Sequence, residues 1–196
     1  TSGTVTLTSI TDTVDNVEAV RLDATISIAS STITVTDAAS LANANTFNSA
    51  TSAQVTLNSV EDTYDNLISI DGITTSEVSM ADAAVKVTSN IDKTKLDTLR
   101  GDTTGTVTVA DITEDKTDLG TISKYGDVDL TTANITVTGN VSKAEADIID
   151  GYNTSGTVTL SSVTDTFTNI NLLHTNNFIS IASAAITVTD AVSVAP

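Results

Sequence analysis

The sequence contains no cysteine, no tryptophan and a single proline in 196 residues. The absence of cysteine excludes a disulfide scaffold and thiolate metal sites. Aromatic residues make up only 3% of the chain, so its core must be built from Val, Ile, Leu and Ala. Such a core suits thin repeated layers better than a bulky globular centre. The hydrophobic content of 39% is still enough to bury a continuous core over this length.

Basic residues are also scarce. Eight Lys and Arg stand against 25 Asp and Glu, which gives a formal net charge of −17. A nucleic acid or an anionic membrane surface would meet long-range repulsion, so neither is expected as a partner. No run approaches the roughly 18 consecutive apolar residues that span a bilayer. Membrane insertion is therefore not expected.

The residues that most enzymes use are largely missing. His174 is the single histidine, and Gly-rich phosphate loops are absent. No acid pair stands apart from the general sequence pattern, so neither a catalytic triad, a zinc site nor a general acid–base pair can be assigned. We predict that the chain is not an enzyme and that His174 is a bystander in a variable loop.

The sequence does contain an internal repeat. TSGTVTLTSITDT at residues 1–13 returns as TSGTVTLSSVTDT at residues 154–166, and intermediate relatives place the period at about 51 residues. A period of this length predicts stacked units, because one unit cannot bury its own apolar face. The units are approximately 1–50, 51–102, 103–153 and 154–196. The last unit is truncated, which predicts that these 196 residues are part of a longer array of units.

Each unit contains short segments with the alternation of a half-buried strand. Thr4–Leu7 and Ile33–Thr36 alternate Thr with apolar residues at a period of two. Ile26–Ile28 adds a third strand. A fourth strand is expected near residues 17–20.

A change of period after each ITVT-type strand predicts a short helix. Ser40, Asp92 and Ser142 are suitable N-cap residues, and Ser142 forms a capping box with Glu145. The fold predicted is mainly β: an elongated repeat β-solenoid of stacked parallel strands with one short α-helix per unit of about 51 residues.

Two threonine ladders follow the outward strand positions. Stacked threonines suit a pleated surface and can hydrogen-bond between layers. An alternative is that a flat threonine face binds ice, although Gln54 and Lys86 interrupt the rows in the second unit. The ladders are Thr6, Thr56, Thr108, Thr159 and Thr36, Thr88, Thr138, Thr189.

An Asp-Thr-x-x-Asn motif recurs in three of the four units. Asn and Asp favour turns, so an asparagine ladder of Asn16, Asn66 and Asn169 is expected at a corner. The alternative is calcium, because stacked carboxylates repel one another unless a hard cation bridges them. The pattern contains neither an EF-hand loop nor a calcium-roll repeat. The candidate metal ligands are Asp12, Asp15, Asp62, Asp65 and Asp165.

Longer phrases resemble a known class of protein. ITVTDAAS, LANANTFNSATSAQVTLNSVEDT and TVTGNVSKAEADIIDGYNTSGTVTLSSVTDT look like the tandem repeats of very large bacterial cell-surface proteins, the adhesin-like or surface-layer-like arrays notable in cyanobacteria. The resemblance covers the whole chain. It implies secretion, an extended stalk or filament, and calcium in the surroundings.

These observations lead to one main functional hypothesis. We expect an acidic, extracellular structural protein of the cell surface that forms part of a fibre, surface layer or adhesin stalk. Its partners would be copies of itself or adjacent repeats of a longer chain, and calcium is the one candidate cofactor. The alternative is a calcium-binding or ice-binding module.

Overall fold

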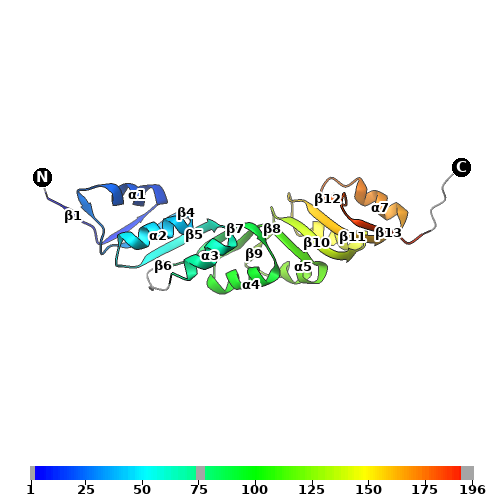
Figure 1. Ribbon diagram of the computed structural model, residues 1–196, viewed down its shortest axis with the longest axis horizontal. Coiled ribbons are helices and arrows are strands. Elements are labelled where there is room, and N and C mark those ends of the chain that lie inside the picture. Colours follow the sequence, from blue (N-terminus) through cyan, green and yellow to red (C-terminus); the bar gives the residue numbers. More distant parts are fainter. Residues whose placement is uncertain (1–2, 74–77, 191–196) are drawn as a thin grey trace. The chain divides into compact units, whose positions relative to one another are not determined.

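The computed structural model describes residues 3–73 and 78–190 of the chain (Figure 1). These residues form seven α-helices and thirteen β-strands. Nine strand pairings among them have an assigned register, and all nine are parallel. The chain divides into two compact units, residues 1–89 with 97–108 and residues 90–96 with 109–196.

The first unit contains a parallel sheet with the strand order β7-β5-β4-β2, and the short β6 also pairs with β5. The strands β1 and β3 form a separate two-stranded sheet. The elements are β1 Val5–Thr6, β2 Ser9–Asp12, α1 Val14–Leu22, β3 Ile26–Ser27, β4 Thr32–Ala39, α2 Leu41–Ala50, β5 Val55–Asp62, α3 Tyr64–Asp71, β6 Val78–Ser79 and β7 Ala84–Ile91.

The second unit contains a parallel sheet with the order β12-β11-β10-β8, to which β13 is added at β11 and β9 at β8. The chain passes between the units in β7, in α4 (Lys93–Asp102) and in β8 (Val107–Asp115). The remaining elements are α5 Lys116–Ile122, β9 Val128–Asp129, β10 Asn134–Val141, α6 Lys143–Asp150, β11 Val158–Asp165, α7 Phe167–His174, β12 Ile179–Ser180 and β13 Ala185–Val188.

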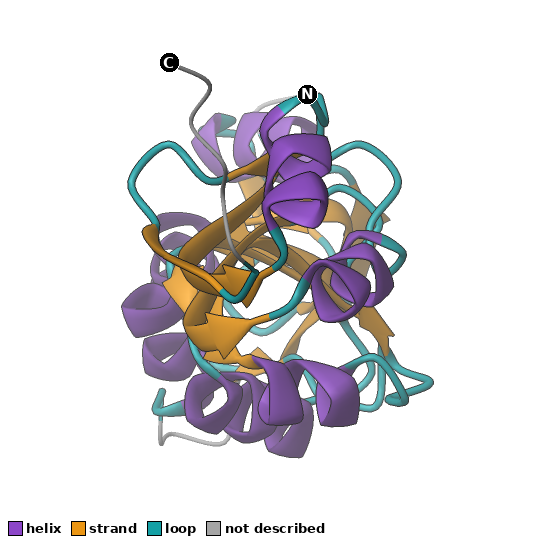
Figure 2. Cartoon of the chain, turned by 90° about the vertical axis from the view of Figure 1, so that its right-hand side faces the viewer, coloured by secondary structure: helices purple, strands orange, loops and turns teal. Residues whose placement is uncertain are grey.

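Alternating side chains explain why the strands and helices pack as they do. Ile33 and Val35 of β4 are fully buried, whereas Thr34 between them remains partly exposed. Each long strand is followed by a helix that buries one apolar edge, such as Ala44 and Phe47 of α2. Parallel neighbours require such crossover connections. The helices lie outside the strands (Figure 2).

The predicted tandem-repeat β-solenoid with one helix per unit is wrong. The fold is mixed α/β, because four further helices, α1, α3, α5 and α7, occupy segments that we expected to be turns or a fourth strand. Residues 17–20, the expected fourth strand, lie inside α1. Thr13 starts α1 by accepting a hydrogen bond from the Asn16 backbone N–H, and Val17 is buried one turn later. Each of the first three sequence periods therefore carries two helices.

The helices expected after the ITVT-type strands are present as α2, α4 and α6. The predicted capping box of Ser142 and Glu145 is confirmed, and Ser40 forms a second capping box with Asn43. Within the described ranges, no helix has both the length and the apolar character needed to cross a membrane.

Candidate functional site

The Asp of the recurring motif stands where a strand ends and two helices begin. Asp62, the last residue of β5, accepts hydrogen bonds at Oδ1 from the Thr63 backbone N–H (2.8 Å) and from Asn66 Nδ2 (2.7 Å). Its Oδ2 accepts from the Leu41 N–H at the start of α2 (3.1 Å). One carboxylate therefore holds the N-termini of α2 and α3 together.

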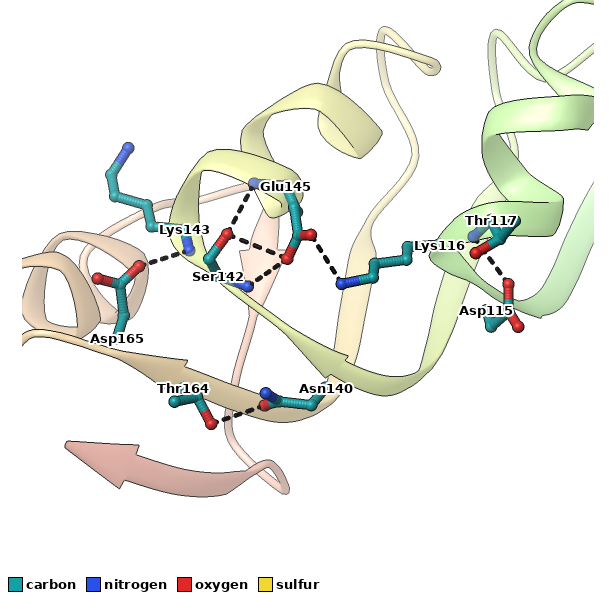
Figure 3. Close-up of polar contacts among 9 residues, drawn as sticks. All are labelled: Asp115, Lys116, Thr117, Asn140, Ser142, Lys143, Glu145, Thr164 and Asp165. Carbon is teal, nitrogen blue, oxygen red and sulfur yellow. Dashed lines mark hydrogen bonds and ion pairs between the residues drawn. The ribbon is translucent and has the colours of Figure 1, made fainter. Parts of the chain in front are cut away.

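Asp165 repeats this arrangement in the second unit. Its Oδ1 accepts from the Thr166 N–H and from Asn169 Nδ2, both at 2.7 Å. Its Oδ2 accepts from the Lys143 N–H at the start of α6 at 2.8 Å, as Figure 3 shows. Asp165 thus joins α6 to α7 in the way that Asp62 joins α2 to α3.

The N-terminus of α6 is held by further polar contacts (Figure 3). Glu145 Oε2 accepts from the Ser142 N–H at 2.8 Å, and Ser142 Oγ accepts from the Glu145 N–H at 3.3 Å. The other oxygen of Glu145 pairs with Lys116 Nζ at 2.7 Å. The Lys116 hydrogen bond, followed by that from Ser142, lowers the pKa of Glu145.

The other two periods use variants of the same cap. Asp12 Oδ1 accepts from the Thr13 N–H (2.9 Å) and from Asn16 Nδ2 (2.7 Å). In the third period, which departs from the motif, Glu114 accepts from the Lys93 N–H and from the Asp115 N–H. The change of motif therefore preserves a carboxylate at the start of a helix.

A second set of caps was missed in the sequence. The first backbone N–H of α1 donates to Asp37 (2.7 Å), that of α3 to Ser89 (2.9 Å), and that of α7 to Asp190 (2.7 Å). These three acceptors share one column of the sequence period. Each lies 23 to 25 residues beyond its donor, so only the column could have revealed it. In the third period this column holds Gly139, which has a φ of 78°.

These hydrogen bonds hold the carboxylates in their charged form. The bonds from Asn16 and Thr13 lower the pKa of Asp12, and those from Lys143, Asn169 and Thr166 lower the pKa of Asp165. Burial alone would raise the pKa of Asp62, but its three hydrogen bonds outweigh burial and the pKa is lowered. The positive ends of the helix dipoles favour the same ionised state.

The structure shows what surrounds each predicted calcium ligand. Calcium requires six to eight oxygen ligands, whereas Oδ1 of Asp12 and both carboxylate oxygens of Asp62 and Asp165 already accept hydrogen bonds from N–H groups. Asp15 and Asp65 lie exposed in the first turns of α1 and α3. Over residues 3–73 and 78–190, no group of three or more His, Asp or Glu is placed to hold a metal ion. In this structure Asp12, Asp62 and Asp165 act as helix caps, and calcium binding by these residues stays a prediction.

The threonines of one predicted ladder interleave with those of other strands. Thr56 lies beside Thr34 of β4 and Ser79 of β6, and Thr159 lies beside Thr136 of β10 and Ser180 of β12. Thr6 pairs with Ser27, and Thr108 lies partly exposed on β8. The second predicted ladder consists of exposed residues, Thr36, Thr88, Thr138 and Thr189.

The threonine rows are short. In the first unit Thr11, Thr34 and Thr56 are register partners across β2, β4 and β5. On β7, a charged side chain replaces the threonine pattern, since Lys86 forms an ion pair with Glu61 at 2.7 Å. A charged pair disrupts the flat, uniform surface that the ice-binding interpretation requires.

His174 ends α7 rather than lying in a loop, and it lines a depression of about 380 Å³. Its neighbours there include Asn176, Asn177 and Ile179. Among the described residues that line the depression, none is a carboxylate or a second histidine. General acid–base catalysis needs such a partner or a bound substrate proton within reach, so His174 carries no catalytic assignment.

No protein-family model matches this chain, and neither a curated protein nor a solved structure matches it.

Proposed function

We propose that this protein is a structural module of an extracellular fibre, surface layer or adhesin stalk. The observation that carries the proposal is the use made of its acidic residues. Asp62 and Asp165 each accept three N–H donors from two successive helices. These carboxylates, which the sequence suggested as metal ligands, therefore act in the structure as helix caps that stabilise the fold.

The energetics favour this role. A helix leaves its first four backbone N–H groups without partners inside the helix. A side-chain cap that satisfies one of them stabilises a helix by about 1 kcal/mol. A carboxylate shared between two helices also ties one β-α layer to the next. Layers that stabilise one another without a ligand are what a structural protein requires.

The two alternatives receive less support. Calcium would have to displace the N–H donors from Asp12, Asp62 and Asp165, and ice would meet the Lys86–Glu61 ion pair. The extracellular location rests on the resemblance to bacterial surface proteins and on the acidic composition without cysteine.

Calorimetric titration of Ca²⁺ into the chelator-treated chain tests the proposal. We expect no saturable heat up to about 1 mM Ca²⁺, the upper end of the range for extracellular calcium modules. The Asp15→Asn/Asp65→Asn variant serves as the matched control, because both residues are exposed and outside the caps. Stoichiometric binding that this variant abolishes would overturn the structural proposal in favour of a calcium module.

A further inference from the structure

The beginning of the chain repeats a segment that already pairs inside it. Residues 1–7 and residues 154–160 are identical, both reading TSGTVTL. Near the other end, ITVT at residues 186–189 repeats ITVT at residues 135–138. The two internal segments are neighbours in the second unit, where β10 pairs with β11.

That internal pairing defines a register. The partners across β10 and β11 are Ile135 with Val158, Thr136 with Thr159 and Val137 with Leu160. The first unit repeats it between β4 and β5, as Ile33 with Val55, Thr34 with Thr56 and Val35 with Leu57. In both places the backbone N–H of the isoleucine donates to the carbonyl before the valine, from Ile135 to Thr157 and from Ile33 to Gln54, each at 2.9 Å.

In the part of the chain that the structure describes, the corresponding strands at the two ends each have a partner on one edge only. Among the described residues, β13 pairs with β11 and β1 pairs with β3. The internal strand β11 pairs with β12 on one side and with β10 on the other. Because β1 and β3 correspond to β11 and β12, the unused edge of β1 is the edge that accepts β10 on β11.

Exposure of apolar side chains marks the same two edges. Ile135, Val137 and Val158 are each 0% exposed. Their counterparts at the ends of the chain are Ile186 at 48%, Val188 at 40% and Val5 at 53%. Exposed valine and isoleucine on an open strand edge are suited to pairing with another strand.

Gly3 provides an independent observation. A Cβ added at Gly105 or Gly156 would lie 2.1 Å from the Ala83 carbonyl oxygen or 1.8 Å from that of Ala133, so both sites require a very small residue. Gly3 corresponds to Gly156, yet nothing lies within 4 Å of a Cβ added there. The close approach that explains Gly156 is missing around Gly3 within its own chain.

We infer that the edge of β13 binds β1 of a second copy of this chain, head to tail. The register expected is Ile186 with Val5, Thr187 with Thr6 and Val188 with Leu7. The Ile186 N–H would donate to the Thr4 carbonyl, and Gly3 would pack against the carbonyl of Ala184. The inference rests on the proposed structural role and names its partner. Such a contact uses two different surfaces, so it builds rings or open filaments.

Disulfide trapping tests the register, and the chain's lack of cysteine gives a clean background. Thr6→Cys and Thr187→Cys variants are mixed under mild oxidation, in enough salt to screen the −17 charge of each copy. We expect a cross-linked heterodimer. The control mixture of Thr4→Cys with Thr187→Cys is displaced by two residues, which puts the Cα atoms beyond the roughly 7 Å that a disulfide allows.

A Gly3→Val variant tests the same contact without cysteine. Valine is used because Ala53 shows that a methyl group is tolerated at one internal junction. Since Gly3 has open space in its own chain, the melting temperature of the variant should equal that of the wild type at low concentration. Its concentration-dependent association, measured by sedimentation velocity, should be lost. A matched Gly126→Val change, which also places the new side chain in open space but lies outside the proposed register, should leave association intact.

The outcomes separate this inference from the function on which it rests. Rapid cross-linking of the Thr6→Cys and Thr187→Cys pair alone, with loss of association in Gly3→Val, supports it. A chain that remains monomeric at about 1 mM, or that associates with equal cross-linking in the displaced control, overturns it. Either of those results leaves the structural role standing, because that role is decided by calcium titration.

Discussion

Asp62 and Asp165 lie at strand ends where each carboxylate meets the N-terminus of its own helix and that of the preceding one. A carboxylate can accept several hydrogen bonds at once. It also carries the charge that a helix N-terminus favours. The sequence pattern Asp-Thr-x-x-Asn is therefore a helix-capping motif. Thr is the N-cap residue, the Asp carboxylate accepts a hydrogen bond from the Thr backbone N–H, and the Asn side chain donates a second hydrogen bond to Asp.

The supporting role of the asparagine leads to a prediction within α7. Asn169→Ala removes the 2.7 Å bond to Asp165, whereas Asn171→Ala alters an exposed position of the same helix. Both changes raise helix propensity by a similar amount. We expect Asn169→Ala to be less stable than Asn171→Ala by about 1 kcal/mol, the net value of one such hydrogen bond. Urea unfolding of the two variants measures the difference. Equal stabilities would contradict the capping role of Asn169.

The lowered pKa values predict how stability depends on pH. The pKa values of Asp12, Asp62 and Asp165 lie below the ordinary value of 3.8. A group with a lowered folded-state pKa contributes stability above its unfolded pKa and loses that contribution as the pH falls through the folded value. Burial raises the pKa values of Asp102 and Asp150, so these two groups act in the opposite direction.

Because the groups with lowered pKa values are the more numerous, we expect the free energy of unfolding to decrease as the pH falls below about 4. Urea unfolding at a series of pH values measures it. The Asp62→Asn variant is the control, since it should show a shallower decrease. Stability that rises steadily through this range would contradict the assignment.

At the scale of elements, the sequence predicted the strands and only some of the helices. Alternation identified the ITVT-type and TVTL-type strands, and N-cap residues identified α2, α4 and α6. The helices α3 and α7 span eight residues each and bury only the pairs Leu67/Ile70 and Ile170/Leu173. Such a short apolar signal was outweighed by Thr, Asp and Asn, which also favour turns.

The candidate site was predicted to a similar extent. The motif located Asp12, Asp62 and Asp165 correctly as a recurring feature, but it did not identify their hydrogen-bond donors. Leu41 lies 21 residues before Asp62, and Lys143 lies 22 residues before Asp165. These distances are about half the sequence period. The donors can be predicted only when a sequence period is recognised as two successive strand–helix units.

Close packing between layers predicts opposite effects at two glycines. In Gly156→Ala the new Cβ would collide with the backbone carbonyl of Ala133, which cannot move without disturbing β10. We expect a loss of about 3 kcal/mol or more. Gly101 lies in α4 with open space around it, so Gly101→Ala should stabilise by up to about 1 kcal/mol. Thermal and urea unfolding check both values. A Gly156→Ala variant as stable as the wild type would refute the close approach.

For the whole molecule, the charge of −17 is partly explained by the caps. Capping carboxylates face the positive ends of helix dipoles, so some of the negative charge is compensated without basic side chains. The few cations are used locally, as in the Lys116–Glu145 and Lys86–Glu61 pairs. The uncompensated remainder keeps copies apart at low salt. Association through strand edges should therefore strengthen as salt is added.

The most direct test of the account is the free energy of unfolding of the wild type and of the Asp62→Asn/Asp165→Asn variant, in excess chelator and in millimolar calcium at matched ionic strength. If these carboxylates act as helix caps, the variant loses about 1 to 2 kcal/mol per carboxylate, and the loss is the same in both buffers. If the variant matches the wild type in chelator and falls behind only when calcium is present, the carboxylates are metal ligands and the structural account is contradicted.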